Sequence, residues 1–130
     1  MNSKRKTVTV ISSIFIGLVA CAGMLLVVAK TKIIRRWIDN VLYDNRYHYL
    51  LCEQLPPISN VERVIQEHQD VIQQIEAVNP GFVGVEINTC NEMQNADITF
   101  WYASHKDRIA IERIIGSDTF FDVPYNLNNR

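Results

Sequence analysis

The chain has 130 residues and a mass of 15.0 kDa, enough for one small domain and little more. Its composition (48% hydrophobic, 21% charged, net charge −1) excludes collagen-like, disordered and strongly nucleic-acid-binding chains. The near-zero charge hides a segregation. Residues 1–36 contain seven basic side chains and no acid, whereas residues 37–130 contain six basic side chains and all 14 acids. The sequence therefore predicts an acidic domain of net charge −8, preceded by a hydrophobic anchor with a basic flank at residues 1–6.

Residues 7–29 form an apolar segment that contains no charged residue and no proline. A helix of this length spans about 35 Å, enough to cross a bilayer core of about 30 Å. The sequence therefore predicts one transmembrane helix, with the lipid bilayer as its partner. Ser13, Gly17 and Cys21 recur at every fourth position and would allow two such helices to pair closely.

Two other interpretations of this segment remain open. A cleaved signal peptide would also begin with basic residues such as those at 4–6, but its apolar core is usually only about 7–15 residues long. Residues 18–21 (LVAC) also match a bacterial lipobox, in which Cys21 would be acylated after cleavage. Against this, residues 22–29 remain apolar, where a lipoprotein normally continues into a polar linker.

The side of the membrane on which the domain lies depends on two opposing signals. Within about 20 residues of the apolar segment, three basic residues precede it and five follow it. By the positive-inside rule this count favours a cytoplasmic C-terminal domain, by a small margin. An N-terminal apolar helix with a basic flank is also the ordinary form of a signal anchor, which exports the domain that follows.

Residues 30–52 are predicted to form a juxtamembrane amphipathic helix and a connector. From residue 31 to about residue 43, apolar side chains occupy one half of the helix circumference and polar side chains the other. We expect an interfacial helix in which Trp37 lies at headgroup depth while Arg35 and Arg36 face anionic lipid. The alternative is that the same apolar stripe packs on the domain or on a partner helix.

His48 and Cys52, in the connector, are spaced as two ligands on one helix face would be. Too few further histidines and cysteines remain outside the anchor to complete a metal site, so we expect no metal and no cofactor. Cys52 and Cys90 could form a disulfide only if the domain is exported.

The domain, residues 53–130, has the pattern helix-strand-strand-helix-strand. Residues 59–62 (SNVE) form a capping box that predicts the start of an amphipathic helix, and residues 79–81 end it. Residues 82–88 and 96–102 alternate between apolar and polar as half-buried strands do.

A second helix is predicted to begin at Ser104 and to end at Gly116. The chain then closes with a third strand in which Phe121 shares the inward side with the alternate residues up to Leu127, and Pro124 indicates an edge position. Two helices on one face of a three-stranded sheet make a two-layer α+β sandwich.

Catalytic motifs are absent from the sequence: it has no phosphate-binding glycine loop, no CxxC pair and no HExxH. Ser104, His105 and Asp107 are the residue types of a hydrolytic triad, but their spacing at a helix start favours capping instead. His68 falls in the middle of an apolar helix stripe, where it is either a hydrogen-bonded core imidazole or a pH-sensitive contact at an interface.

The outward face of the predicted sheet combines acidic side chains with an aromatic one. Glu86, Asp97, Trp101 and Asp122 would lie there, and such a surface would suit a partner protein with a basic surface. The same carboxylates could instead collect a divalent cation, or the face could simply be solvated.

The sequence therefore favours a single-pass, membrane-tethered interaction or assembly module without catalysis and without nucleic-acid binding. A membrane-bound sensor of a small ligand or cation is the alternative, and a small hydrolase built on Ser104 and His105 is the third.

Overall fold

The computed structural model describes residues 23, 32–90, 92 and 94–130 of the chain. Residue contacts divide the chain into two compact units, residues 1–37 and 38–130. The predicted transmembrane helix, with Cys21, lies outside the described residues except for Gly23. In the described part, no helix has the length and apolar character needed to cross a bilayer.

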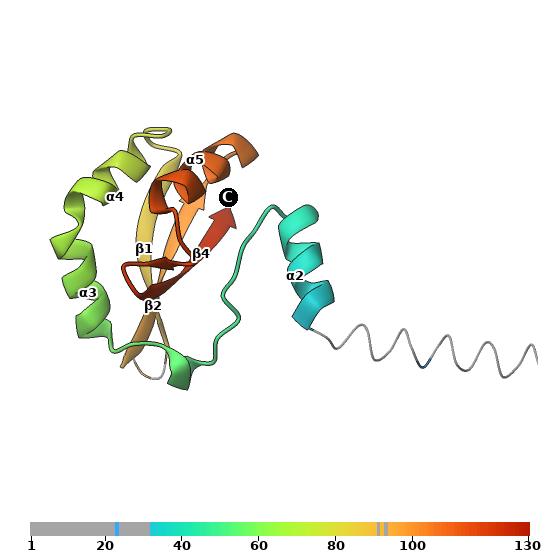
Figure 1. The fold of residues 1–130 in the computed structure, drawn as a ribbon, viewed down its shortest axis with the longest axis horizontal. Coiled ribbons are helices and arrows are strands. Elements are labelled where there is room, and N and C mark those ends of the chain that lie inside the picture. Colours follow the sequence, from blue (N-terminus) through green and yellow to red (C-terminus); the bar gives the residue numbers. More distant parts are fainter. Residues whose placement is uncertain (1–22, 24–31, 91, 93) are drawn as a thin grey trace, which may run out of the picture. The chain divides into compact units, whose positions relative to one another are not determined.

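The second unit is an α+β domain with a four-stranded mixed sheet, drawn in Figure 1. The elements in chain order are α2 (Lys32–Val41), η1 (Cys52–Gln54), α3 (Ile58–Glu67), α4 (Gln69–Glu76), β1 (Val83–Cys90), β2 (Asn95–Tyr102), α5 (His105–Ile115), β3 (Thr119–Phe120) and β4 (Val123–Asn129). The strand order in the sheet is β1-β2-β4-β3. β1 and β2 form an antiparallel hairpin, β4 runs parallel to β2, and β3 pairs antiparallel with β4.

Helices α3, α4 and α5 cover one face of the sheet, and the core lies between them and the strands (Figure 1). The strand residues on this face are apolar and alternate with polar residues, as the sequence pattern predicted for residues 82–88 and 96–102. The side chains of this face that are fully or almost fully buried are Val83, Ala96, Ile98, Phe100, Tyr102, Val123, Tyr125 and Leu127.

The predicted first helix is divided in two at His68. Its backbone (φ −119°, ψ 34°) leaves the helical region, so α3 ends and α4 begins there. The predicted capping box is also wrong: α3 begins at Ile58, two residues earlier than an N-cap at Ser59 implies, and Pro57 precedes it without a side-chain cap. The first amide of α3 is satisfied by tertiary structure instead, because Ile58 donates to the carbonyl of Gln94 at 3.0 Å.

The predicted third strand is two strands joined by a tight turn. Phe121 and Asp122 have positive φ angles (49° and 68°), the type I′ pattern that closes a two-residue hairpin between β3 and β4. The turn resets the alternation, so that Phe120 is fully buried and Phe121 is exposed. The predicted edge position of Pro124 is wrong as well, because β3 lies outside β4 in the sheet. The proline is tolerated at this position because the pairing of β4 with β2 starts only at Tyr125.

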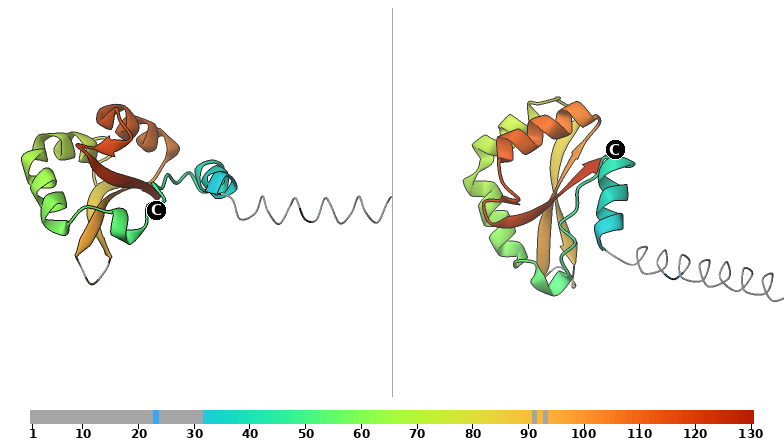
Figure 2. Two further views of the ribbon diagram at one scale, coloured as in Figure 1. Left: turned by 60° about the horizontal axis from the view of Figure 1, so that its bottom comes forward. Right: turned by 45° about the vertical axis from the view of Figure 1, so that its right-hand side comes forward.

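Residues 43–57, which we call the strap, cover the face of the sheet opposite the helices (Figure 2). One end of the strap pairs with β4, where the backbones of Arg46 and Leu127 exchange hydrogen bonds of 2.9 and 2.7 Å. Its other end pairs with β2, where the amide of Ala96 donates to the carbonyl of Pro56 at 3.0 Å. The strap is a layer that the predicted two-layer sandwich lacks.

Candidate functional site

The strap holds a half-buried histidine against a buried aspartate of the sheet. His48 Nε2 lies 2.7 Å from Asp97 Oδ2, and the two side chains are only 14% and 4% exposed. Asn126 of β4 joins them: its amide nitrogen donates to the same Asp97 oxygen at 3.1 Å, and its amide oxygen accepts from the backbone N–H of His48 at 3.2 Å. Three distant segments of the chain therefore meet at one carboxylate.

The hydrogen bonds at His48 fix its tautomer. The backbone N–H of Leu50 donates to Nδ1 at 2.9 Å, so that nitrogen carries no proton. The proton therefore lies on Nε2 and is donated to Asp97, which makes the pair a neutral imidazole and a carboxylate. The second oxygen of Asp97, Oδ1, is buried and has no hydrogen-bond partner among the described residues. Asp97 consequently depends on His48 and Asn126 for its stabilisation.

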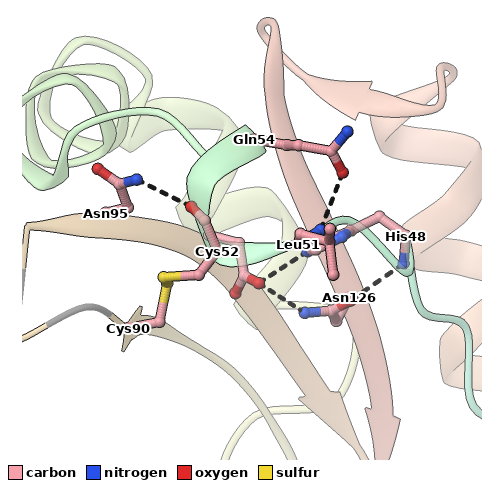
Figure 3. Close-up of a disulfide and its surroundings, with 8 residues drawn as sticks. His48, Leu51, Cys52, Gln54, Cys90, Asn95 and Asn126 are labelled. Atoms are coloured by element: carbon pink, nitrogen blue, oxygen red, sulfur yellow. Dashed lines mark hydrogen bonds and ion pairs between the residues drawn. A yellow bond between two sulfur atoms is a disulfide. The ribbon is translucent and has the colours of Figure 1, made fainter.

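A disulfide between Cys52 and Cys90 fastens the strap beside this cluster (Figure 3). The Cα atoms are 6.0 Å apart, and 38 residues separate the two cysteines in the sequence. Asn95, at the start of β2, adds a side-chain hydrogen bond of 2.8 Å to the carbonyl of Cys52. The cysteines that the sequence allowed as metal ligands are thus joined to each other. In the described part of the chain, no group of three or more histidine, cysteine or acidic side chains could hold a metal ion.

A second polar cluster surrounds Asp44 at the other end of the strap. Asp44 Oδ1 accepts from Arg108 at 2.9 Å and contacts the exposed His105 Nδ1 at 2.7 Å. Burial alone would lower the pKa of Arg108, but Asp44 and Glu112 outweigh it and raise the pKa above its usual value. Arg108 also contacts Asn40 of α2. This cluster attaches the C-terminal turn of α2 to α5.

A shallow cavity of about 720 Å³ lies next to the Asp44 cluster, lined in part by Ser104, His105 and Arg108. The nitrogen donors of His105 and Arg108 would be the natural contacts for an anionic ligand, but both side chains are paired with Asp44. The cavity therefore offers a ligand little unsatisfied charge.

The residues of the suspected triad do not form one. Ser104 is the N-cap of α5, and its Oγ accepts a 3.3 Å hydrogen bond from the backbone N–H of Asp107. The Asp107 carboxylate accepts from the Asn79 side chain at 3.1 Å, which lowers the pKa of Asp107. His105 contacts Asp44, as described above. The capping prediction is confirmed, as is the end of α5 at Gly116.

The four residues predicted to form one outward, partner-binding surface are not presented together. Asp97 is buried under the strap, because the strap covers the sheet face that the alternation left open. Glu86 pairs with Arg130, with a distance of 3.2 Å from Nη1 to Oε2, and Asp122 lies in the β3–β4 turn. Trp101 is half-buried against Gly84, its partner in the β1–β2 ladder, where a Cβ would overlap the indole ring.

His68 is half-buried between α3 and α4 and contacts the β3–β4 hairpin. Its ring stacks on Phe121, with ring centroids 3.4 Å apart and planes at 5°, and meets the edge of Phe120. The prediction of a pH-sensitive contact at this residue remains a prediction.

Exposed acidic side chains gather on α3 and α4 instead of on the sheet. Every acidic residue of the two helices is exposed, and the one arginine among them, Arg63, is paired with Glu67 at 2.7 Å. We call these residues the acidic row: Glu62, Glu67, Asp70 and Glu76.

The amphipathic helix predicted at residues 31–43 is present as α2 (Lys32–Val41). Its large apolar side chains are uncovered: Ile33 is 76% exposed, Trp37 59% and Val41 57%. Arg35 is exposed as well. None of the residues of α2 is buried.

The sequence pattern does not predict the cluster at His48. The spacing of His48 indicates only a metal ligand, and the alternation around Asp97 indicates only an exposed acid. The signal that could have found the pair was the disulfide, because joining Cys52 to Cys90 brings the strap across the start of β2. Comparison of the chain with protein-family models, with curated proteins and with solved structures found no match.

Proposed function

We propose that the chain is a single-pass, membrane-tethered interaction or assembly module that performs no catalysis. The observation that carries this proposal is α2, an amphipathic helix whose apolar side chains are exposed and which follows the apolar segment at residues 7–29. An exposed apolar stripe beside basic side chains is the pattern of a helix that lies in the headgroup region. The bilayer is therefore the first partner, and the domain beyond α2 is available to a second one.

The chain contains two tryptophans, one in α2 and one in the domain, so that membrane contact of each can be measured separately. The variant Trp101→Phe, reconstituted in vesicles of lipids with brominated acyl chains, is expected to show strong quenching of the remaining Trp37 fluorescence. The matched variant Trp37→Phe leaves Trp101, which is expected to stay unquenched. Equal quenching of the two variants would contradict the proposed position of α2.

The second partner is proposed to present a basic surface, and the acidic row is the surface that we propose it contacts. Residues 37–130 carry a net charge of −8, and the row concentrates exposed carboxylates with a single, already paired arginine. Complementary charge steers association and fixes the partner's orientation. This moves the proposed contact from the sheet face, which the strap covers, to the outer side of α3 and α4.

Reversing charge in the acidic row is expected to reduce capture of the partner from mild detergent extracts. We expect the double variant Glu62→Lys, Glu76→Lys to recover about tenfold less partner than the unmodified chain, a loss typical of rim charges in combination. The control variant Glu53→Lys, Glu92→Lys changes net charge equally at exposed positions outside the row. Equal losses in both variants would mean that net charge alone, and not the acidic row, attracts the partner.

We further propose that the domain lies on the non-cytoplasmic side of the membrane. Disulfides persist in oxidising compartments and are rare in the reducing cytosol, so the Cys52–Cys90 bond supports an exported domain. The flanking charges alone favoured the cytoplasm by a small margin, whereas the basic residues before the apolar segment also fit a signal anchor. The disulfide therefore supports the signal-anchor orientation, in which the domain is exported, over the cytoplasmic one.

A further inference from the structure

The sheet has one long strand edge that the described residues cover only at its first residue, where Val83 forms an isolated bridge with Pro80. In the order β1-β2-β4-β3, the outer edge at β3 is only two residues long, whereas β1 at the other edge has eight. β2 is the only strand with which the described part of the chain pairs β1 in a ladder. Such an edge presents a row of backbone groups that another strand can bind.

The register identifies which residues of β1 point their backbone groups outward. In β2, the amide of Ala96 and the carbonyl of Tyr102 bond to segments on the side away from β1. Backbone direction alternates along a strand, so the residues between them, such as Thr99, bond to β1, and their ladder partners are Gly84, Glu86 and Asn88. The outward-facing residues of β1 are therefore the alternate ones: Val83, Val85, Ile87 and Thr89.

The outer edge of β1 lacks the usual protection against pairing. In natural proteins, proline, lysine or a β-bulge in an edge strand prevents another strand from pairing with it. The sequence of β1 (VGVEINTC) contains no proline and no lysine. Its single charge, Glu86, is paired with Arg130. Val85 and Ile87 pack only partly against the core and remain half-exposed beside the edge. A further strand would complete both their backbone bonding and their burial.

We propose that β1 pairs with β1 of a second copy of this chain, antiparallel and centred on Ile87. In a two-fold pairing, outward-facing residues must meet outward-facing residues, which leaves two registers with long overlap. Centring on Glu86 places two carboxylates directly opposite each other, which is unfavourable. Centring on Ile87 places Ile87 against its counterpart, Val85 against Thr89, and Glu86 against Asn88. The result is a continuous eight-stranded sheet with about six new backbone hydrogen bonds.

The two copies repel each other through their net charge, and this gives the pairing a distinct salt dependence. Added salt screens repulsion between like-charged domains, so self-association is expected to strengthen as salt rises. Binding of a basic partner to the acidic row is expected to weaken as the salt concentration rises, because salt screens attraction as well as repulsion. The self-pairing does not depend on that partner, and the two proposals can therefore fail separately.

Cysteine crosslinking of the full chain tests the register. In a Cys21→Ser background with the native disulfide intact, the variant Ile87→Cys is expected to form a crosslinked dimer under mild oxidation. Directly opposed residues of a bonded pair lie about 5.5 Å apart at Cα, within reach of a disulfide. The variant Val85→Cys alone should not crosslink, because its two copies would be about 13 Å apart. A mixture of the Val85→Cys and Thr89→Cys variants should form a crosslinked dimer, because these two positions lie opposite each other in the proposed register.

A proline variant tests the edge itself. Ile87→Pro removes an outward amide while sparing the β1–β2 ladder, and we expect the dimer fraction to fall by about tenfold. Retention of the Cys52–Cys90 bond shows that the variant is folded. The proposal is overturned if Ile87→Cys stays monomeric. It is also overturned if Ile87→Cys crosslinks only when mixed with Val85→Cys, the pattern of the register centred on Glu86.

Discussion

Replacing His48 with alanine is expected to lower the free energy of unfolding of the domain by about 2–3 kcal/mol. The substitution removes one of the two side-chain donors to Asp97 and leaves a carboxylate that is 4% exposed, whose other oxygen already has no partner among the described residues. Most of the loss comes from the hydrogen bond that the buried carboxylate no longer receives, because the neutral imidazole contributes a donor and not a charge. The measurement is urea unfolding of the full chain in mild detergent, followed by circular dichroism.

The domain contains its own control, because a second histidine makes the same contact at the surface. His105 also lies 2.7 Å from an aspartate oxygen, that of Asp44, but its side chain is 69% exposed. His105→Ala is therefore expected to cost less than about 1 kcal/mol. The double variant His48→Ala, Asp97→Ala should cost less than His48→Ala alone, since it leaves no buried charge. If His48→Ala and His105→Ala lowered the free energy of unfolding equally, the burial of Asp97 would not be the reason for the large effect at His48.

Sequence patterns predicted those parts of the fold that local forces determine. The start of α5 follows from the capping geometry of Ser104, and its end follows from Gly116, whose φ of 67° few other residues adopt. The hairpin of β1 and β2 followed from two runs of alternating residues. In each case the information lies within a few neighbouring residues, so one sequence is sufficient to predict the structure.

The errors arose where distant residues decide the structure. Alternation identified the inward face of β2 correctly, but it says nothing about what covers the other face. Asp97 was therefore predicted to be exposed, although a segment about 50 residues earlier in the chain buries it. At the other end, the alternation of residues 120–127 fitted one strand, because a two-residue turn at Phe121 and Asp122 lacks the glycine or asparagine that usually marks it.

The Cys52–Cys90 disulfide also holds the strap on the sheet, and its removal is expected to lower the free energy of unfolding strongly. The variant Cys52→Ser, Cys90→Ser is expected to lose about 4 kcal/mol of unfolding free energy, the loop-closure value for a separation of 38 residues. Cys21→Ser, at the remaining cysteine of the chain, serves as the control. In intact membranes, the unmodified chain should show no maleimide labelling of Cys52 or Cys90 until a reductant is added. Labelling without reductant would contradict the bond, and with it the support that the bond gives to the proposed exported side.

The two determinants of the strap are expected to be coupled. His48 and Cys52 lie four residues apart on the strap, and they hold it against neighbouring parts of the sheet: His48 against Asp97 of β2, and Cys52 against Cys90 at the end of β1 (Figure 3). Once the disulfide is lost, the strap separates from the sheet more easily and water reaches Asp97, so His48→Ala should cost less in the Cys52→Ser, Cys90→Ser background than in the native chain. Hydrogen exchange at the amide of Ala96, which donates to the strap at Pro56, should accelerate in the same variants. Strictly additive free energies would mean that the histidine and the disulfide act on separate parts of the domain, whereas a coupling of about 1–3 kcal/mol would identify the strap as one cooperative unit.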